Sequence, residues 1–205
     1  MDLSAAYDRS FFEMHMPWRA EYEAIADVLV AGLKFSSVID LGCGNGFILN
    51  RLAQNGKEVI GVDGSSHALA AAPSELRPRL IAADLTQPLR LGQHDLVICS
   101  EVAEHLEPRH ANILVDNICG HSAESVFFTA AVPGQGGHGH VNEQPHEYWI
   151  AMFALRGFQL DAGSTSNLRR DLSERIHTIW WFTHNALVFR CPTDTTDAGA
   201  ASPAS

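Results

Sequence analysis

Short apolar runs recur along the chain up to residue 131, and stretches with helical spacing separate them. In these runs the apolar residues are consecutive rather than alternating, which is typical of strands buried on both faces of a sheet. The runs span residues 37–41, 58–62, 80–83, 95–99 and 125–131, and the helical stretches span 47–54, 65–72 and 109–119. This alternation predicts strand–helix–strand units, and hence an α/β fold with a mainly parallel sheet and right-handed crossovers.

The two ends of the chain follow other patterns. Residues 18–33 carry apolar positions at helical spacing, so residues 1–35 are expected to form a helical cap segment. After residue 145 a helix is expected over 145–156, then a strand at 158–162, an irregular or helical stretch to about 177, and a last strand at 186–190. Residues 191–205 are small and polar, and we expect them to be disordered.

Composition narrows the class of protein. The 205 residues are 46% hydrophobic, which suits one folded domain. The formal charge of −10 disfavours large nucleic acids as partners, because they are polyanions. Four widely spaced cysteines favour a reduced, cytoplasmic protein. Neither a membrane-spanning run nor the basic-then-apolar pattern of a signal peptide is found, so no membrane partner is expected.

The strongest motif is VIDLGCGNG at residues 38–46, where a predicted strand runs into three alternating glycines. Glycines at such a point allow a sharp turn and let a ligand approach the main chain. The spacing differs from the G-x-G-x-x-G of dinucleotide folds, and Asp40 stands just before the glycines. That carboxylate would repel a pyrophosphate and attract a ligand that carries an ammonium and a sulfonium group.

Two further aspartates follow the next two predicted strands. Asp63 ends the second strand, where a carboxylate can accept hydrogen bonds from both ribose hydroxyls. Asp84 ends the third strand, where it can meet an exocyclic amine such as that of adenine. Because the carboxyl ends of parallel strands share one edge, all three aspartates are expected to face the crevice where open α/β sheets bind ligands.

These motifs, followed by HDLVICSEVAEHL at residues 94–106, resemble those of the Rossmann-like (class I) S-adenosylmethionine-dependent methyltransferases over about residues 36–190. The resemblance implies a doubly wound, mostly parallel sheet with an antiparallel C-terminal strand, helices on both faces, and S-adenosyl-L-methionine as cofactor. It places Ser100 with Glu101 beneath the methionine part, and Asp84 with Leu85 at the adenine. The cofactor-binding residues that it implies are Asp40, Gly42, Cys43, Gly44, Gly46, Asp63, Gly64, Asp84, Leu85 and Ser100.

After the fourth predicted strand, Glu101, Glu104 and His105 are spaced so that they share one face if the stretch is helical. Such a group can bind a divalent cation, Mg²⁺ or Mn²⁺, or act in acid–base chemistry. The pattern E-x-x-E-H also resembles two metal-dependent branches of the family, the small-RNA 3′-terminal 2′-O-methyltransferases and the O-methyltransferases of ubiquinone biosynthesis. A purely structural or orienting role stays open, because similar sequences occur in methyltransferases without a metal.

Residues 133–149, PGQGGHGHVNEQPHEYW, combine four glycines with three histidines after the fifth predicted strand. They are interpreted in three ways. The segment is a solvent loop, or a lid on which His140 or Asn142 touches the acceptor, or the source of a metal ligand. In the third case His140, with His146 as the alternate, joins Glu101, Glu104 and His105.

Together these patterns predict an S-adenosylmethionine-dependent methyltransferase acting on a hydroxyl of a small molecule or sugar, with catalytic residues His105, His140 and Glu101. One alternative is a metal-dependent 2′-O-methyltransferase acting on an RNA 3′ end. Another is a catalytically silent S-adenosylmethionine-binding partner subunit. The apolar N-terminal residues Phe11, Phe12, Met14, Met16 and Trp18 are expected to pack over the cofactor or in the core.

Overall fold

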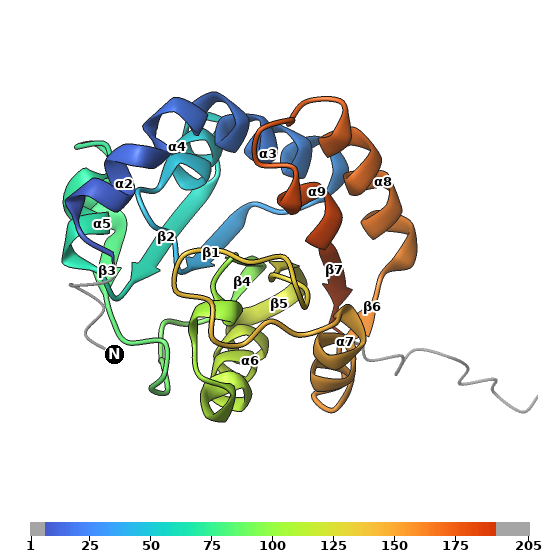
Figure 1. Cartoon of the computed structure of the whole chain (residues 1–205). Helices are drawn as coiled ribbons and strands as arrows, with labels where there is room; N and C mark the ends of the chain where they lie inside the picture. Colours follow the sequence, from blue (N-terminus) through green and yellow to red (C-terminus); the bar gives the residue numbers. More distant parts are fainter. Residues whose placement is uncertain (1–6, 192–205) are drawn as a thin grey trace, which may run out of the picture.

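A computed structural model describes residues 7–191. The disorder expected for the C-terminal tail falls almost wholly on residues 192–205, which lie outside the described residues, as do residues 1–6. The centre of the structure is one sheet of seven strands in the order β3-β2-β1-β4-β5-β7-β6 (Figure 1). The strands are β1 Ser37–Leu41, β2 Glu58–Asp63, β3 Leu80–Ala82, β4 His94–Ser100, β5 Ser122–Thr129, β6 Gln159–Leu160 and β7 Leu187–Arg190. The first five are parallel, and β7 runs antiparallel to both β5 and β6. The predicted fold class is confirmed.

The helices cover both faces of the sheet (Figure 1). They are α2 Arg9–His15, α3 Arg19–Gly32, α4 Phe47–Gln54, α5 Ser66–Ala71, α6 Ala111–His121, α7 His146–Ala154, α8 Ala162–Ser173 and α9 Trp181–Asn185. Short 3₁₀ turns are η1 Met16–Trp18, η2 Arg77–Arg79, η3 Ala103–His105 and η4 Pro108–His110. None of the helices within residues 7–191 is both long and apolar enough to cross a membrane.

Two apolar cores lie on opposite faces of the sheet. Helices α3, α4, α8 and α9 pack on one face, and α6 and α7 pack on the other. Neighbouring positions of β1 serve both cores, since Val38 belongs to the first and Ile39 to the second, and neither is exposed to solvent. This alternation explains why the central strands carry consecutive apolar residues, as the sequence indicated.

The region after β5 differs most from the expectation. The strand expected at 158–162 contains only Gln159 and Leu160, because Asp161 caps the next helix by accepting a hydrogen bond from Ser164 N. The stretch left open to about residue 177 is mainly helix α8, and the short helix α9 was not expected. β5 also begins earlier than expected, at Ser122.

Candidate active site

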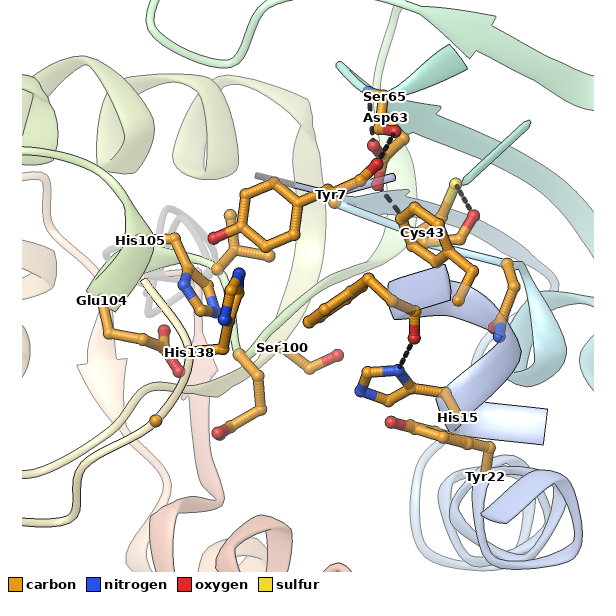
Figure 2. A pocket seen from close by; sticks show the side chains of 18 of the residues that line it. Tyr7, His15, Tyr22, Cys43, Asp63, Ser65, Ser100, Glu104, His105 and His138 are labelled. Atoms are coloured by element: carbon orange, nitrogen blue, oxygen red, sulfur yellow. Dashed lines mark hydrogen bonds between the residues drawn. The ribbon is translucent and has the colours of Figure 1, made fainter. Parts of the chain in front are cut away.

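A cavity of about 560 Å³ lies along the edge where β1, β2 and β4 end. Its floor comes from the loops that follow these strands, and its roof comes from the N-terminal segment that contains α2 and η1. Loop residues after β5 and three consecutive residues at α9, Trp180, Trp181 and Phe182, complete the wall. Figure 2 shows side chains from these separate parts of the chain pointing into one space.

The glycine-rich loop turns back on β2. The amides of Gly42 and Cys43 both donate to the carbonyl of Val62, at 2.7 and 3.0 Å. Gly42 has φ +90°, and a Cβ on it would lie 2.2 Å from a methyl of Val102. Gly42 is therefore required both for the turn and for the close contact with the chain that follows β4.

Asp63, at the end of β2, organises the same loop. Its carboxylate accepts hydrogen bonds from the amides of Gly44 and Ser65, each at 2.8 Å. Burial nevertheless raises the pKa of Asp63, because these two bonds offset only part of the cost of removing the charge from water. The carboxylate lines the cavity, where it is available for the expected ribose contact.

Asp40 is a buried carboxyl that lacks a partner on one oxygen. It is 2% exposed, and its Oδ1 makes no hydrogen bond to any of the described residues. Burial, followed by the nearby charge of Asp63, raises the pKa of Asp40 to about 8. A buried carboxylate without compensation is costly, so a cationic ligand in the cavity would relieve this cost.

The remaining residues predicted to bind the cofactor are also assembled here. All ten predicted cofactor residues line the cavity except Gly46, whose left-handed backbone forms the N-cap of α4. The carboxylate of Asp84 is exposed and accepts bonds from Thr86 N and Oγ1, at 2.9 and 2.7 Å. Leu85 beside it is buried. Their individual contacts with a cofactor remain predictions.

Glu101 departs from the helical geometry assumed for E-x-x-E-H. The backbone of Glu101 has a φ of 54°. It is the one non-glycine residue with positive φ in the described range. Its amide donates to both oxygens of Thr129, at 3.0 Å to Oγ1 and 3.1 Å to the carbonyl. Because only the 3₁₀ turn Ala103–His105 follows, the shared helical face is wrong, and a strained turn sets the direction of Glu101.

Glu104 is fully buried beside Glu101. Its Oε1 accepts from Ala131 N at 3.3 Å, and its Oε2 has no partner among the described residues. Burial raises the pKa of both carboxyls, and the neighbouring Glu101 raises that of Glu104 further. Glu104 is thus the member of the pair that holds a proton more strongly.

His105 is a neutral imidazole on the cavity wall. Burial, and then the neighbouring His140, lower the pKa of His105 to about 4. Its ring stands edge-on to those of Tyr7 and His140, with centroids 5.5 and 4.9 Å away. A neutral ring keeps a lone pair that can accept a proton or bind a cation at neutral pH.

The glycine- and histidine-rich loop is folded around Glu143. The carboxylate accepts from Gly134 N at 2.8 Å, from Gly136 N at 2.7 Å and from His140 Nδ1 at 2.9 Å. Since a carboxylate only accepts, Nδ1 carries the hydrogen and Nε2 of the neutral ring keeps its lone pair. Two histidines of this loop, His138 and His140, line the cavity, and Glu143 orients the imidazole of His140.

The structure brings together part of the predicted metal group. Glu104, His105 and His140 each offer a ligand atom, and these atoms lie within 4.8 Å of one another. Glu101 is not a member of this group. His146, the alternate, lies on α7 with its ring 5.8 Å from that of His184. Three of the residues predicted to bind a cation thus lie close enough together, among the described residues, to hold one.

The roof of the cavity includes a residue that the sequence reasoning missed. Tyr7 turns its hydroxyl end toward His105 and His138 (Figure 2). The hydroxyl is buried without a hydrogen bond to the described residues, and burial raises the pKa of Tyr7 to about 12. Asp8, whose side chain caps α2 by accepting from Phe11 N, was the available signal that Tyr7 precedes a helix.

The expected N-terminal apolar cluster follows Tyr7. Four of its five members line the cavity, namely Phe11, Phe12, Met14 and Trp18, whereas Met16 is not among the lining residues. These four residues therefore lie at the cavity, and Phe12 is buried as well. Packing of this cluster over a bound cofactor stays a prediction.

Comparison with known proteins agrees with this geometry. A family model described as a methyltransferase domain matches residues 39–116. A ubiquinone biosynthesis O-methyltransferase of Nitrosomonas europaea is 30% identical over 146 residues, covering 66% of this chain and 55% of that protein. One from Acinetobacter baumannii strain AYE is 31% identical over 134 residues, covering 62% and 52%. The chain thus spans about half the length of these curated relatives.

Solved structures share the fold at low sequence identity. The sugar N-methyltransferase KedS8 from Streptoalloteichus sp. ATCC 53650 superposes with a TM-score of 0.67 at 15% identity, covering 90% of this chain and 92% of that one. Magnesium protoporphyrin IX methyltransferase from Synechocystis PCC 6803 gives 0.63 at 18% identity, covering 85% and 84%. The chain thus carries a match to a methyltransferase domain over residues 39–116, is similar to O-methyltransferases over part of their length, and shares the Rossmann-like fold of class I methyltransferases.

Proposed function

We propose that this protein transfers a methyl group from S-adenosyl-L-methionine to a hydroxyl of a small, uncharged, largely apolar acceptor. The observation that carries the proposal is the placement of His140. Glu143 orients this imidazole, and it lies with His105 on the wall of the cavity that also holds the cofactor residues. A lone pair beside a methyl donor is what the deprotonation of an attacking hydroxyl needs.

The floor of the cavity suits the cofactor. Asp40 offers a buried carboxylate to the ammonium or sulfonium group, and the glycine loop leaves its main chain open to close approach. Asp63 and Asp84 are available for the ribose and the adenine. The cofactor's positive charge would offset the burial cost of Asp40, which makes binding more favourable than shape alone would.

The other part of the cavity suits an apolar acceptor. Aromatic rings dominate it, including those of Phe11, Trp18, Tyr22, Trp180 and Trp181. None of the cavity-lining residues in the described chain is a lysine or an arginine. Phosphate and carboxylate groups are normally bound by such cations, so the wall favours an acceptor without an anionic group. This also counts against an RNA 3′ end as the acceptor, in agreement with the net charge of −10.

A sugar hydroxyl fits this wall less well than a phenolic or enolic one, because a sugar would leave many polar groups unpaired against aromatic rings. The named relatives are O-methyltransferases of ubiquinone biosynthesis, which agrees with oxygen as the methylated atom. His140 is the group that accepts the hydroxyl proton, and His105, whose pKa of about 4 keeps it neutral but makes it a weak base, offers its lone pair to the same space.

A divalent cation is a further part of the proposal. Glu104 Oε2 and His105 Nδ1 are buried without a partner in residues 7–191, so the donor set has free ligand atoms. One carboxylate and two imidazoles suit Mn²⁺ or Zn²⁺ better than Mg²⁺, which prefers oxygen ligands. A bound cation would make an acceptor hydroxyl more acidic. Titration of the purified protein with Mn²⁺ in a calorimeter, with His140→Ala as the control, tests this part separately.

The main test is methyl transfer from radiolabelled S-adenosylmethionine to a panel of phenols and catechols, each with a carboxylated counterpart. We expect neutral members to be methylated on oxygen and anionic members to be poor substrates. Measured alongside, His140→Ala is expected to lower kcat by about a hundredfold or more, a common cost of removing a general base. Cofactor binding without transfer to any acceptor would instead support the catalytically silent subunit.

A further inference from the structure

Asn185 is a fully buried polar residue at the end of α9, just before β7. Its Nδ2 donates to Gln135 Oε1 at 3.0 Å and to Glu101 Oε1 at 3.4 Å. Gln135 belongs to the loop after β5, and Glu101 follows β4, so the three residues come from distant parts of the sequence. Both partners of Asn185 line the cavity, whereas Asn185 does not.

The orientation of this amide follows from its neighbours. With Nδ2 toward Gln135 and Glu101, each of its hydrogens can face an oxygen. The flipped orientation would instead place Oδ1 against the oxygens of a carboxylate and an amide, which repel it. An amide neither gains nor loses a proton in the physiological range, so these two donors are present at every pH at which the protein is folded.

We infer that Asn185 is a positioning residue that holds the Glu101 carboxylate and the Gln135 side chain at fixed places on the cavity wall. The inference rests on the proposed methyl transfer, since it assigns Asn185 an effect on that reaction. Glu101 needs such a partner, because its backbone adopts a left-handed conformation and its neighbours include Glu104, His140 and Tyr22. Without this donor, the buried Glu101 carboxylate would lose one of its hydrogen bonds, and other rotamers of Glu101 would become more favourable.

The second bond of Asn185 acts on the loop. Gln135 lies between Gly134 and Gly136, whose amides both donate to the Glu143 carboxylate that orients His140. Fixing the Gln135 side chain therefore restrains the two neighbouring amides that donate to Glu143. The amide of Asn185 thus restrains both the Glu101 carboxylate and the loop that carries His140.

The first test is a kinetic double-mutant cycle. Asn185→Leu keeps the size of the side chain and removes both donors, and it is made in the wild-type and Glu101→Ala proteins. We expect kcat to fall about tenfold in the wild-type protein and clearly less in Glu101→Ala, where only the action of Asn185 on Gln135 is left to lose, because interacting residues are non-additive. An equal loss of kcat in both backgrounds would show that Asn185 does not act through Glu101 and would overturn that half of the inference.

The matched control is Thr165→Val. Thr165 is buried in α8, and its Oγ1 accepts from Val188 N in the strand that follows Asn185, but it does not line the cavity. Loss of this bond perturbs the same layer of the protein without reaching Glu101 or Gln135. We expect kcat to remain at the wild-type value.

The second test needs no turnover. In the protein without ligands, hydrogen exchange of the Gly134 and Gly136 amides should be several-fold faster in Asn185→Leu than in the wild type, and unchanged in Thr165→Val. Equal exchange in all three proteins would refute the action on the loop. If the wild-type protein transfers no methyl group, the proposed function fails, and this exchange experiment still decides whether Asn185 holds the loop.

Discussion

Gly137 lies directly against the ring of His140. A Cβ on Gly137 would stand 2.2 Å from His140 Nε2, and the backbone there has φ +159°. This backbone contact, together with the bond from Nδ1 to Glu143, leaves the imidazole little freedom to turn.

Gly137→Ala is therefore expected to displace the His140 ring and to lower kcat at least tenfold, while cofactor affinity changes little. The matched variant is Gly92→Ala, at a glycine with φ +78° where a Cβ meets nothing within 4 Å. It also places an alanine at a positive φ, but outside the loop that carries His140, so its kcat should equal that of the wild type. Wild-type kcat in Gly137→Ala would show that the position of this ring does not limit turnover.

Glu143→Ala should loosen the loop. The change leaves the amides of Gly134 and Gly136 without their acceptor and frees His140 Nδ1. We expect a loss of about 0.5–1.5 kcal/mol in the free energy of unfolding, the net contribution of a hydrogen bond whose donor water can reach. Urea denaturation measures this loss. Glu147→Ala, at an exposed glutamate in the first turn of α7, should show less than about 0.5 kcal/mol.

Tyr7→Phe separates stability from ligand binding. The Tyr7 hydroxyl is buried without a partner in the described structure, so its removal should leave the melting temperature of the free protein the same or slightly higher. If the hydroxyl donates to a bound acceptor, the KM for the acceptor should rise several-fold. Thermal unfolding together with acceptor kinetics tests both expectations. A lower melting temperature would mean that the hydroxyl already has a partner in the free protein.

Asp40 makes the free protein sensitive to pH. Its pKa is about 8 in the folded state, against 3.8 for an ordinary aspartate, so between about pH 4 and 8 the folded state holds a proton that the unfolded state has lost. The free energy of unfolding contributed by this group therefore decreases as the pH rises through that window.

The neutral variant Asp40→Asn should remove this contribution. We expect its stability without cofactor to decline less between pH 5 and 8 than that of the wild type, as measured by urea denaturation at both values. Binding of S-adenosylmethionine should be weakened in the same variant, because the ligand's positive charge loses its carboxylate. Parallel pH dependences would show that Asp40 is not the buried acid responsible.

Local sequence was sufficient to predict the floor of the site. The glycines after β1 and the aspartates at the ends of β1, β2 and β3 lie in segments whose order and spacing define the sheet edge. Parallel strands align their carboxyl ends, so these residues converge without any information about distant contacts.

Other parts depend on contacts that no local pattern encodes. The left-handed turn at Glu101 is held by Thr129, 28 residues later, so helical spacing was misleading there. Asn185 reads as a polar residue in a short amphipathic stretch, and only the packing of α9 buries it. The strand expected at 158–162 was shortened by a capping interaction that outweighed β propensity.

The strand pairing also determines when the site can form during synthesis. β7 lies between β5 and β6, so the sheet is complete only after the last strand has left the ribosome. A nascent chain that ends before α9 would contain the glycine loop and the aspartates but would lack the amide that contacts Glu101 and Gln135. The residues at the carboxyl edge of the sheet are therefore made well before the amide that contacts Glu101 and Gln135.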